Sequence, residues 1–69
     1  SGDDVYETLA PTNAAAFDAL FDLYRSSMPT AERKSRAALQ ALAARPDYQV
    51  LLLRRAGRLI GYSITFVPP

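Results

Sequence analysis

The chain has 69 residues, enough for one small domain, and domains of this size bury only about 60% of their unfolded surface. It contains no cysteine and no histidine, which excludes disulfide bonds, zinc sites built on these residues, and serine–histidine or cysteine–histidine catalytic pairs within it. The net charge of +1 divides unevenly, because residues 1–24 carry acids alone and residues 25–69 carry every Lys and Arg. This division suggests either a basic surface for phosphates or two halves that face and neutralise each other.

No apolar run approaches the ~18–20 residues of a membrane-spanning helix, and no signal peptide opens the chain. We therefore expect no membrane association and a cytoplasmic location. The chain begins with Ser1 and Gly2, which is typical of a protease-cleavage scar, so residues 1–4 are expected to form a tag scar and flexible start. Residues 1–69 would then be part of one domain from a larger polypeptide.

The first predicted elements are a short strand and a helix. Residues 5–9 alternate between the two faces of an extended chain and stop before Pro11, which predicts a strand. Thr12 or Asn13 can cap the helix that follows by accepting a hydrogen bond from a free backbone N–H. One stripe of this helix is apolar at helical spacing and consists of Phe17, Leu20, Phe21, Tyr24 and Met28.

A second helix is predicted after Pro29, which ends the first because the residue before a proline is pushed out of the α region. Thr30 would cap it, with Glu32 in its first turn favoured by the helix dipole. Its alanines give high intrinsic helix propensity, and its inner face would comprise Ala31, Ser35, Ala38, Leu39 and Leu42. The outer, solvated face would carry Arg33, Lys34 and Arg36, and Pro46 would end the helix after Arg45.

The last third of the chain predicts a hairpin. Residues 50–53 are consecutively apolar, which is typical of a strand covered on both faces by helices on one side or both. Gly57 supplies the positive φ of the turn in Arg55-Ala56-Gly57-Arg58. In the strand over 59–67, Gly61 marks a bulge or a close approach of another backbone or ligand. One face of this strand would carry Ile60, Tyr62, Ile64 and Phe66, and the other Leu59, Gly61, Ser63, Thr65 and Val67.

These elements predict an α/β (α+β) fold in the order β-α-α-β-β, with a mixed, mostly antiparallel sheet and two helices. The sheet is open at its last strand. Strand 59–67 would then be a long apolar edge with unpaired N–H and C=O groups, and such edges recruit other strands. We expect the remainder of the domain or a companion chain to cover it.

Few residues point to chemistry. The sequence has no glycine-rich loop that could cradle a phosphate. Glu32 could act as a base or simply satisfy a helix start, and the tyrosines could contact a substrate or lie at the edge of the core. The basic cluster Arg33-Lys34-x-Arg36 lacks interleaved aromatic residues, which argues against nucleic-acid binding. Met28 and Pro29 draw attention because loops on a rigid scaffold often meet ligands.

Two stretches of the chain, 23–33 and 48–62, resemble the N-terminal half of the GNAT N-acetyltransferases. Many members of that family have a helix that ends in a Ser-Phe-Pro-x-x-Glu-Arg-like loop, where this chain has Met28 in place of the phenylalanine. A helix, a strand, a short turn with glycine, and a strand with an apolar-glycine pair follow, here Ile60-Gly61. The order and spacing of these motifs carry the resemblance, which runs from about Val5 to Phe66.

The resemblance implies transfer of an acetyl or other acyl group from acyl-CoA to a small-molecule or peptide amine by direct attack on the thioester, without a metal. In that family a Gln/Arg-x-x-Gly-x-Gly/Ala turn after the fourth strand holds the acetyl-CoA pyrophosphate at a helix N-terminus, and this chain has no such turn. Acetyl-CoA and the tyrosine that often protonates the thiolate would therefore belong to residues beyond this chain, which alone would be inactive. This chain would supply the acceptor side, through Tyr24, Met28, Pro29, Glu32 and Tyr62; its catalytic residues are unassigned.

Two other readings stay open. The chain could be a non-catalytic small α/β interaction module that pairs through its edge strand. It could also be a degenerate GNAT-like domain of a multidomain enzyme. A glycine-rich turn in the residues after 69, or in a second chain, would separate these readings from the enzyme.

Overall fold

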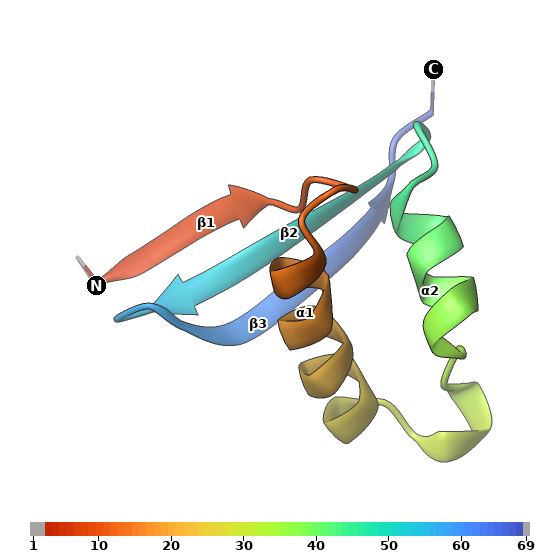
Figure 1. The fold of residues 1–69 in the computed structure, drawn as a ribbon, viewed down its shortest axis with the longest axis horizontal. Coiled ribbons are helices and arrows are strands. Elements are labelled where there is room, and N and C mark those ends of the chain that lie inside the picture. The colour runs from red at the N-terminus through yellow and green to blue at the C-terminus, as the bar shows by residue number, and fades with distance from the viewer. Residues whose placement is uncertain (1–2, 69) are drawn as a thin grey trace.

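The computed structural model describes residues 3–68 and consists of one sheet with two helices packed on it. Its elements are β1 (Asp4–Thr8), α1 (Ala14–Ser27), the 3-10 turn η1 (Thr30–Glu32), α2 (Arg36–Ala43), β2 (Tyr48–Arg55) and β3 (Arg58–Phe66). The sheet is antiparallel, with β2 between β1 and β3 (Figure 1). A small α+β domain with two helices, as predicted, is confirmed. Within residues 3–68, no helix is long and apolar enough to cross a membrane.

The first helix forms as its sequence predicts. Of the two candidate caps, Asn13 is the one used, and its side chain accepts a hydrogen bond from the Ala16 N–H at 3.1 Å. The helix ends at Ser27 because Met28 is already extended (φ −97°, ψ 132°) ahead of Pro29. The buried residues of α1 are Ala16, Phe17, Leu20 and Tyr24.

The second helix starts later than predicted, so the prediction that Thr30 caps it is wrong. Residues 30–32 make a single 3-10 turn, and α2 begins at Arg36 behind Ser35, whose hydroxyl accepts from the Ala38 N–H at 3.2 Å. The reason is tertiary: the Tyr24 hydroxyl accepts a hydrogen bond from the Lys34 N–H at 2.8 Å, in a stretch where Arg33 is extended. A helix running from Thr30 would have used that N–H within its own ladder.

The basic cluster predicted on the solvated face of α2 is exposed at Lys34 and Arg36, but its predicted place on the helix is wrong for two of the three residues. Arg33 and Lys34 precede the helix, and the Arg33 side chain is half-buried. Arg36 lies over the rings of Phe17 and Phe21, with centroid distances of 5.1 and 5.4 Å, and pairs with Asp18 on α1. The cluster therefore helps to join α1 to the start of α2.

Three leucines have no exposed surface, and each comes from a different element: Leu20 from α1, Leu39 from α2 and Leu52 from β2. Burial of one leucine side chain stabilises a fold by roughly 1.5–3 kcal/mol. Because these leucines belong to one cluster, the core links both helices to the central strand. The other buried members of the cluster are Leu9, Ala16, Phe17, Tyr24 and Val50.

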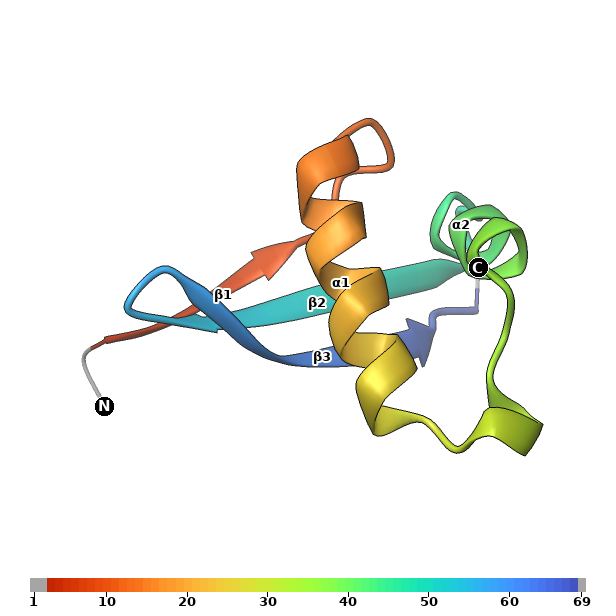
Figure 2. The same ribbon diagram turned by 60° about the horizontal axis from the view of Figure 1, so that its bottom comes forward.

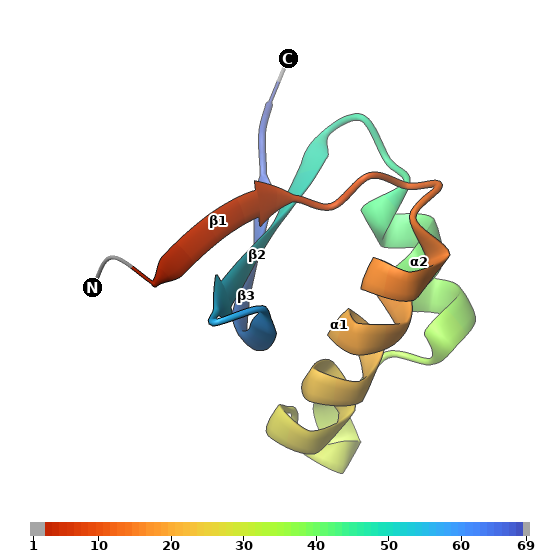
Figure 3. The same ribbon diagram turned by 60° about the vertical axis from the view of Figure 1, so that its left-hand side comes forward.

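Both helices lie on one face of the sheet, so the two faces of β2 have different surroundings (Figure 3). Val50 and Leu52 are buried on the helix side, whereas Leu51 and Leu53 are only half-buried on the other. We call that other side the open face; its central residues are Tyr6, Leu51, Leu53, Gly61 and Ser63, which the strand register places on the same side.

β3 carries a bulge that shifts its alternation. Gly61 lies opposite Leu53 and Leu59 lies opposite Arg54, so Ile60 is an extra residue in the strand. Leu59 packs against the core as a result, while Ile60 is 36% exposed. The predicted faces of these two residues are therefore wrong, because one inserted residue exchanges the faces beyond it. The bulge indicated by Gly61 is confirmed.

The two sides of β2 offer a matched test of the fold. We expect Leu52→Ala to lower the free energy of unfolding by about 3 kcal/mol or more, because it opens a cavity among fully buried side chains. Leu53→Ala, at the next position on the open face, should cost about 1 kcal/mol. Urea denaturation of both variants measures the difference, and equal losses would contradict the one-sided arrangement.

A substitution in the hairpin turn between β2 and β3 should stabilise the fold. Ala56 (φ 51°) and Gly57 (φ 79°) both adopt positive φ, which is the requirement of a type I′ turn. A non-glycine residue in this region is strained by roughly 1 kcal/mol, and asparagine tolerates it better than alanine. Ala56→Asn should therefore raise the unfolding free energy by about 0.5 kcal/mol, and Ala56→Val should lower it. A thermal melt that ranks valine above asparagine would contradict this conformation.

Candidate functional site

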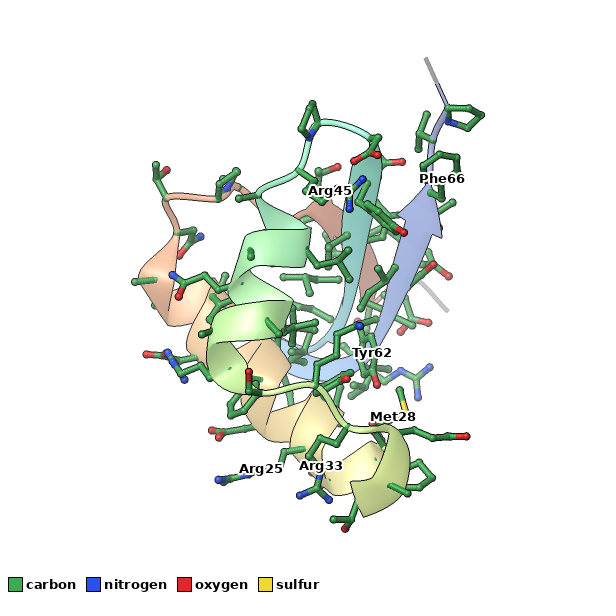
Figure 4. All side chains as sticks on the ribbon, turned by 90° about the vertical axis from the view of Figure 1, so that its right-hand side faces the viewer. Arg25, Met28, Arg33, Arg45, Tyr62 and Phe66 are labelled. Carbon is green, nitrogen blue, oxygen red and sulfur yellow. The ribbon has the colours of Figure 1, made fainter. Side chains whose placement is uncertain are left out.

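The end of α1 and the segment behind it pack against the middle of β3. The rings of Tyr24 on α1 and Tyr62 on β3 are 6.1 Å apart and tilted by 56°. The Ser27 Oγ and the Tyr62 hydroxyl lie within hydrogen-bond distance, at 3.0 Å. Tyr62 lies toward the end of the molecule that carries Met28 and Arg33, away from Arg45 and Phe66 (Figure 4). The structure thus brings together two of the five predicted acceptor residues, Tyr24 and Tyr62, and adds Ser27.

Tyr24 has a structural task in this cluster. It is 2% exposed, and its ring continues an aromatic row along α1 in which Phe17, Phe21 and Tyr24 follow one another at centroid distances of 6.3 Å. Its hydroxyl accepts a hydrogen bond from the Lys34 N–H. Tyr24 therefore orients the segment after α1, and the half-buried Tyr62 offers the more accessible hydroxyl.

Residues 28–35, which we call the connecting segment, are held at several points. The Met28 N–H donates to the Tyr24 carbonyl at 2.9 Å, and the Met28 side chain packs against the core. The Arg33 guanidinium donates through Nη2 to the Met28 carbonyl at 3.3 Å, and its Nε is buried without a hydrogen-bond partner. The Pro29 carbonyl accepts from the Glu32 N–H at 3.0 Å. These bonds give the segment a defined shape.

Pro29 and Glu32 are exposed on this segment. Glu32 ends a three-residue 3-10 turn, so its predicted place in the first turn of a long helix is wrong. Ser27 and Arg33 were missed as members of the cluster. Both residues belong to the Ser-Met-Pro-x-x-Glu-Arg stretch on which the family resemblance rests, so that motif could have found them. The half-buried position of Arg33, in contrast, depends on where α2 begins.

Charge on the connecting segment is only partly compensated. Ion pairs join the acidic first part of the chain to the basic remainder, as in Asp18–Arg36, Glu7–Arg54 and Asp4–Arg55. These pairs support the prediction that the two halves neutralise each other. Within the part of the chain that the structure describes, Arg33 and Lys34 form no ion pair. The exposed Glu32 likewise forms no ion pair among these residues, so the surface beside Met28 carries an acidic and a basic group close together.

Two surface hollows lie away from this segment. One of about 410 Å³ is lined by Arg45, Pro46, Asp47 and Val67, and there the hydrogen bond from Arg45 holds the pKa of Asp47 below its ordinary value. The other, of about 190 Å³, lies on the open face beside Gly61. Among residues 3–68, no group of three or more acidic side chains could hold a metal ion.

Helix α1 positions the cluster by crossing the sheet, so that its last turns lie over β3 (Figure 2).

We compared the chain with protein-family models, with curated proteins and with solved structures, and none of the three comparisons gives a match. The assignment of a function therefore rests on the residues and their geometry.

The two tyrosine hydroxyls can be separated by removing each in turn. Tyr24→Phe leaves the part-buried Lys34 N–H without its acceptor, so we expect a loss of about 1 kcal/mol and faster hydrogen exchange at the Lys34 amide. Tyr62→Phe removes an exposed bond and should cost less than about 0.5 kcal/mol, with no change at Lys34. Denaturation and amide exchange by NMR measure both effects. Unchanged exchange at Lys34 in Tyr24→Phe would contradict the role given to Tyr24.

Proposed function

We propose that this chain is the acceptor-side portion of a GNAT-like N-acetyltransferase, which passes an acetyl or acyl group from acyl-CoA to an amine. The observation that carries the proposal is the packing of the α1 end on β3 through Tyr24, Ser27 and Tyr62. The resemblance names these same two regions, the loop after the first helix and the face of the last strand, as the acceptor side. The β-α-α-β-β order supports it as well.

The roles proposed for this chain are binding and orientation of the amine. Glu32 would attract the protonated amine, and Met28 and Pro29 would contact its apolar part. The Tyr62 hydroxyl would hydrogen-bond a polar group of the acceptor, with Ser27 fixing its direction. In the reaction the ammonium group first loses a proton, and the free amine nitrogen then bonds to the thioester carbon. The carbon–sulfur bond breaks, and a second proton passes from the nitrogen to the CoA thiolate. No residue of this chain is assigned to either proton transfer.

The described residues do not fit acetyl-CoA. Both helix N-termini are capped by their own side chains, Asn13 and Ser35, and neither follows a glycine-rich turn. The described glycines lie in the hairpin turn and in β3, where no helix start is near to support a pyrophosphate. The proposal therefore assigns the cofactor to residues outside this sequence, in strands that continue the sheet along residues 59–67.

One observation favours a second candidate, a small interaction module without catalysis. β3 forms an edge of the sheet and carries exposed apolar side chains, which suits β-strand addition by a partner chain. A degenerate GNAT-like domain in a larger enzyme would keep the same edge for its own further strands. Binding of acetyl-CoA by a longer form of the protein separates the enzyme from both.

We expect the 69-residue chain alone to give no saturable heat with acetyl-CoA in calorimetric titration, because the phosphate cradle is absent from it. A longer protein that adds the proposed cofactor side to this chain should bind acetyl-CoA and acetylate amines. In that longer protein Glu32→Gln should raise the KM for the amine several-fold, because it removes the charge that attracts the ammonium group.

Asp47→Asn is the matched control, since Asp47 is an acid in the hollow away from the connecting segment. Tight acetyl-CoA binding by the short chain would contradict the division into two sides. Failure of the longer protein to bind acetyl-CoA would contradict the proposed acetyltransferase activity.

A further inference from the structure

The outer edge of β3 presents a definite set of backbone groups. The Val67 N–H donates to the Asp47 carbonyl on the β2 side at 2.7 Å. Because hydrogen-bonded pairs alternate along antiparallel strands, the register after the bulge turns Gly61, Ser63 and Thr65 toward β2. The N–H and C=O of Tyr62, Ile64 and Phe66 therefore point outward. Within residues 3–68, no loop, cap or side chain hydrogen-bonds to these outer groups.

The two edges of the sheet are protected very differently. β1 is five residues long and carries Asp4 and Glu7, which pair with arginines of β2, so charges blunt that edge. β3 is nine residues long and has no charged residue after Arg58. Three of the exposed large apolar residues lie on it or directly after it, namely Ile60, Phe66 and Val67. β3 is therefore the edge that can accept another strand.

The regular part of this edge is symmetric about one residue. The bulge at Ile60 interrupts the ladder on one side, and Pro68, which has no N–H, interrupts it on the other. The uninterrupted window runs over 62–66 and is centred on Ile64. A strand of the same sequence, laid antiparallel about a two-fold axis at Ile64, offers the same outward groups in return, as a two-fold contact requires.

We propose that β3 pairs with β3 of a second copy of this chain, so that two three-stranded sheets become one antiparallel sheet. Ile64 then faces Ile64 of the second copy, and Tyr62 faces Phe66, an aromatic cross-strand pair on the helix side. In the antiparallel arrangement the two Arg58 side chains lie at opposite ends of the paired β3 strands, so no like charges lie opposite each other. This inference does not rest on acetyl transfer, but it uses the edge that the proposed function assigns to further strands, so the two occupants exclude each other.

Charge changes on exposed side chains test the pairing. In this register Ser63 lies opposite Thr65 of the second copy, on the open face. Sedimentation equilibrium of the 69-residue chain should show a monomer–dimer equilibrium. The Ser63→Lys, Thr65→Lys variant places Lys opposite Lys twice and should raise the dimer dissociation constant about tenfold. The Ser63→Lys, Thr65→Glu variant places opposite charges there and should not raise it.

A folded chain that stays monomeric up to millimolar concentration would overturn the proposal, as would an equal effect of the two charge variants. Circular dichroism at low concentration confirms that each variant is folded, which separates loss of pairing from loss of structure. Neither result bears on acetyl-CoA binding, so failure here is distinguishable from failure of the proposed enzyme.

Disulfide formation tests the register, since the chain has no native cysteine. Ser63 and Thr65 of the second copy would form a non-hydrogen-bonded pair with Cα atoms about 4.5 Å apart, within the range of a disulfide. An oxidised equimolar mixture of Ser63→Cys and Thr65→Cys chains should give mainly the mixed dimer. Each variant alone should cross-link slowly, because its own cysteines would lie about 8 Å apart. Statistical yields of the three dimers would overturn this register.

Discussion

The shared burial of Leu20, Leu39 and Leu52 is the constraint on which this fold depends. Two helices and a central strand each contribute one of these leucines, so each element is held by the other two. A chain of this size has little further apolar surface to bury, and the helices cover only one face of the sheet (Figure 3). The open face and the edge of β3 follow from this one-sided core.

The same packing creates the candidate site. Leu20 joins α1 to the core, and α1 packs against β3, so Tyr24 and Ser27 arrive beside Tyr62. The Tyr24 hydroxyl then accepts a hydrogen bond from the Lys34 N–H, which fixes the path of the connecting segment. The proposed acceptor residues are therefore displayed by the core, which explains why a buried tyrosine stands at the centre of a surface region.

The edge of β3 joins the two proposals. A further strand that carries the cofactor side would use the outward N–H and C=O groups of Tyr62, Ile64 and Phe66, and so would β3 of a second copy. The two occupants compete for one ladder, so the self-associated form of the short chain and the extended sheet of a longer protein are alternative ways to satisfy the same groups. The charges on β1 direct both to β3 rather than to the opposite edge.

The sequence by itself determined the local elements. The break at Pro29 and the positive φ at Gly57 depend on the chemistry of nearby residues, and the structure has them where the sequence predicts. The sequence narrows the cap to Thr12 or Asn13, and Gly61 to a bulge or a close approach; the structure selects Asn13 and the bulge. The sequence also singled out Tyr24 and Tyr62, whose rings the structure brings together. Only the tertiary structure decided where α2 begins, which face Leu59 takes, and that Arg33 is half-buried. Those features depend on contacts between distant residues, such as Tyr24 with Lys34, which compete with local preference and leave no periodic signal in the sequence.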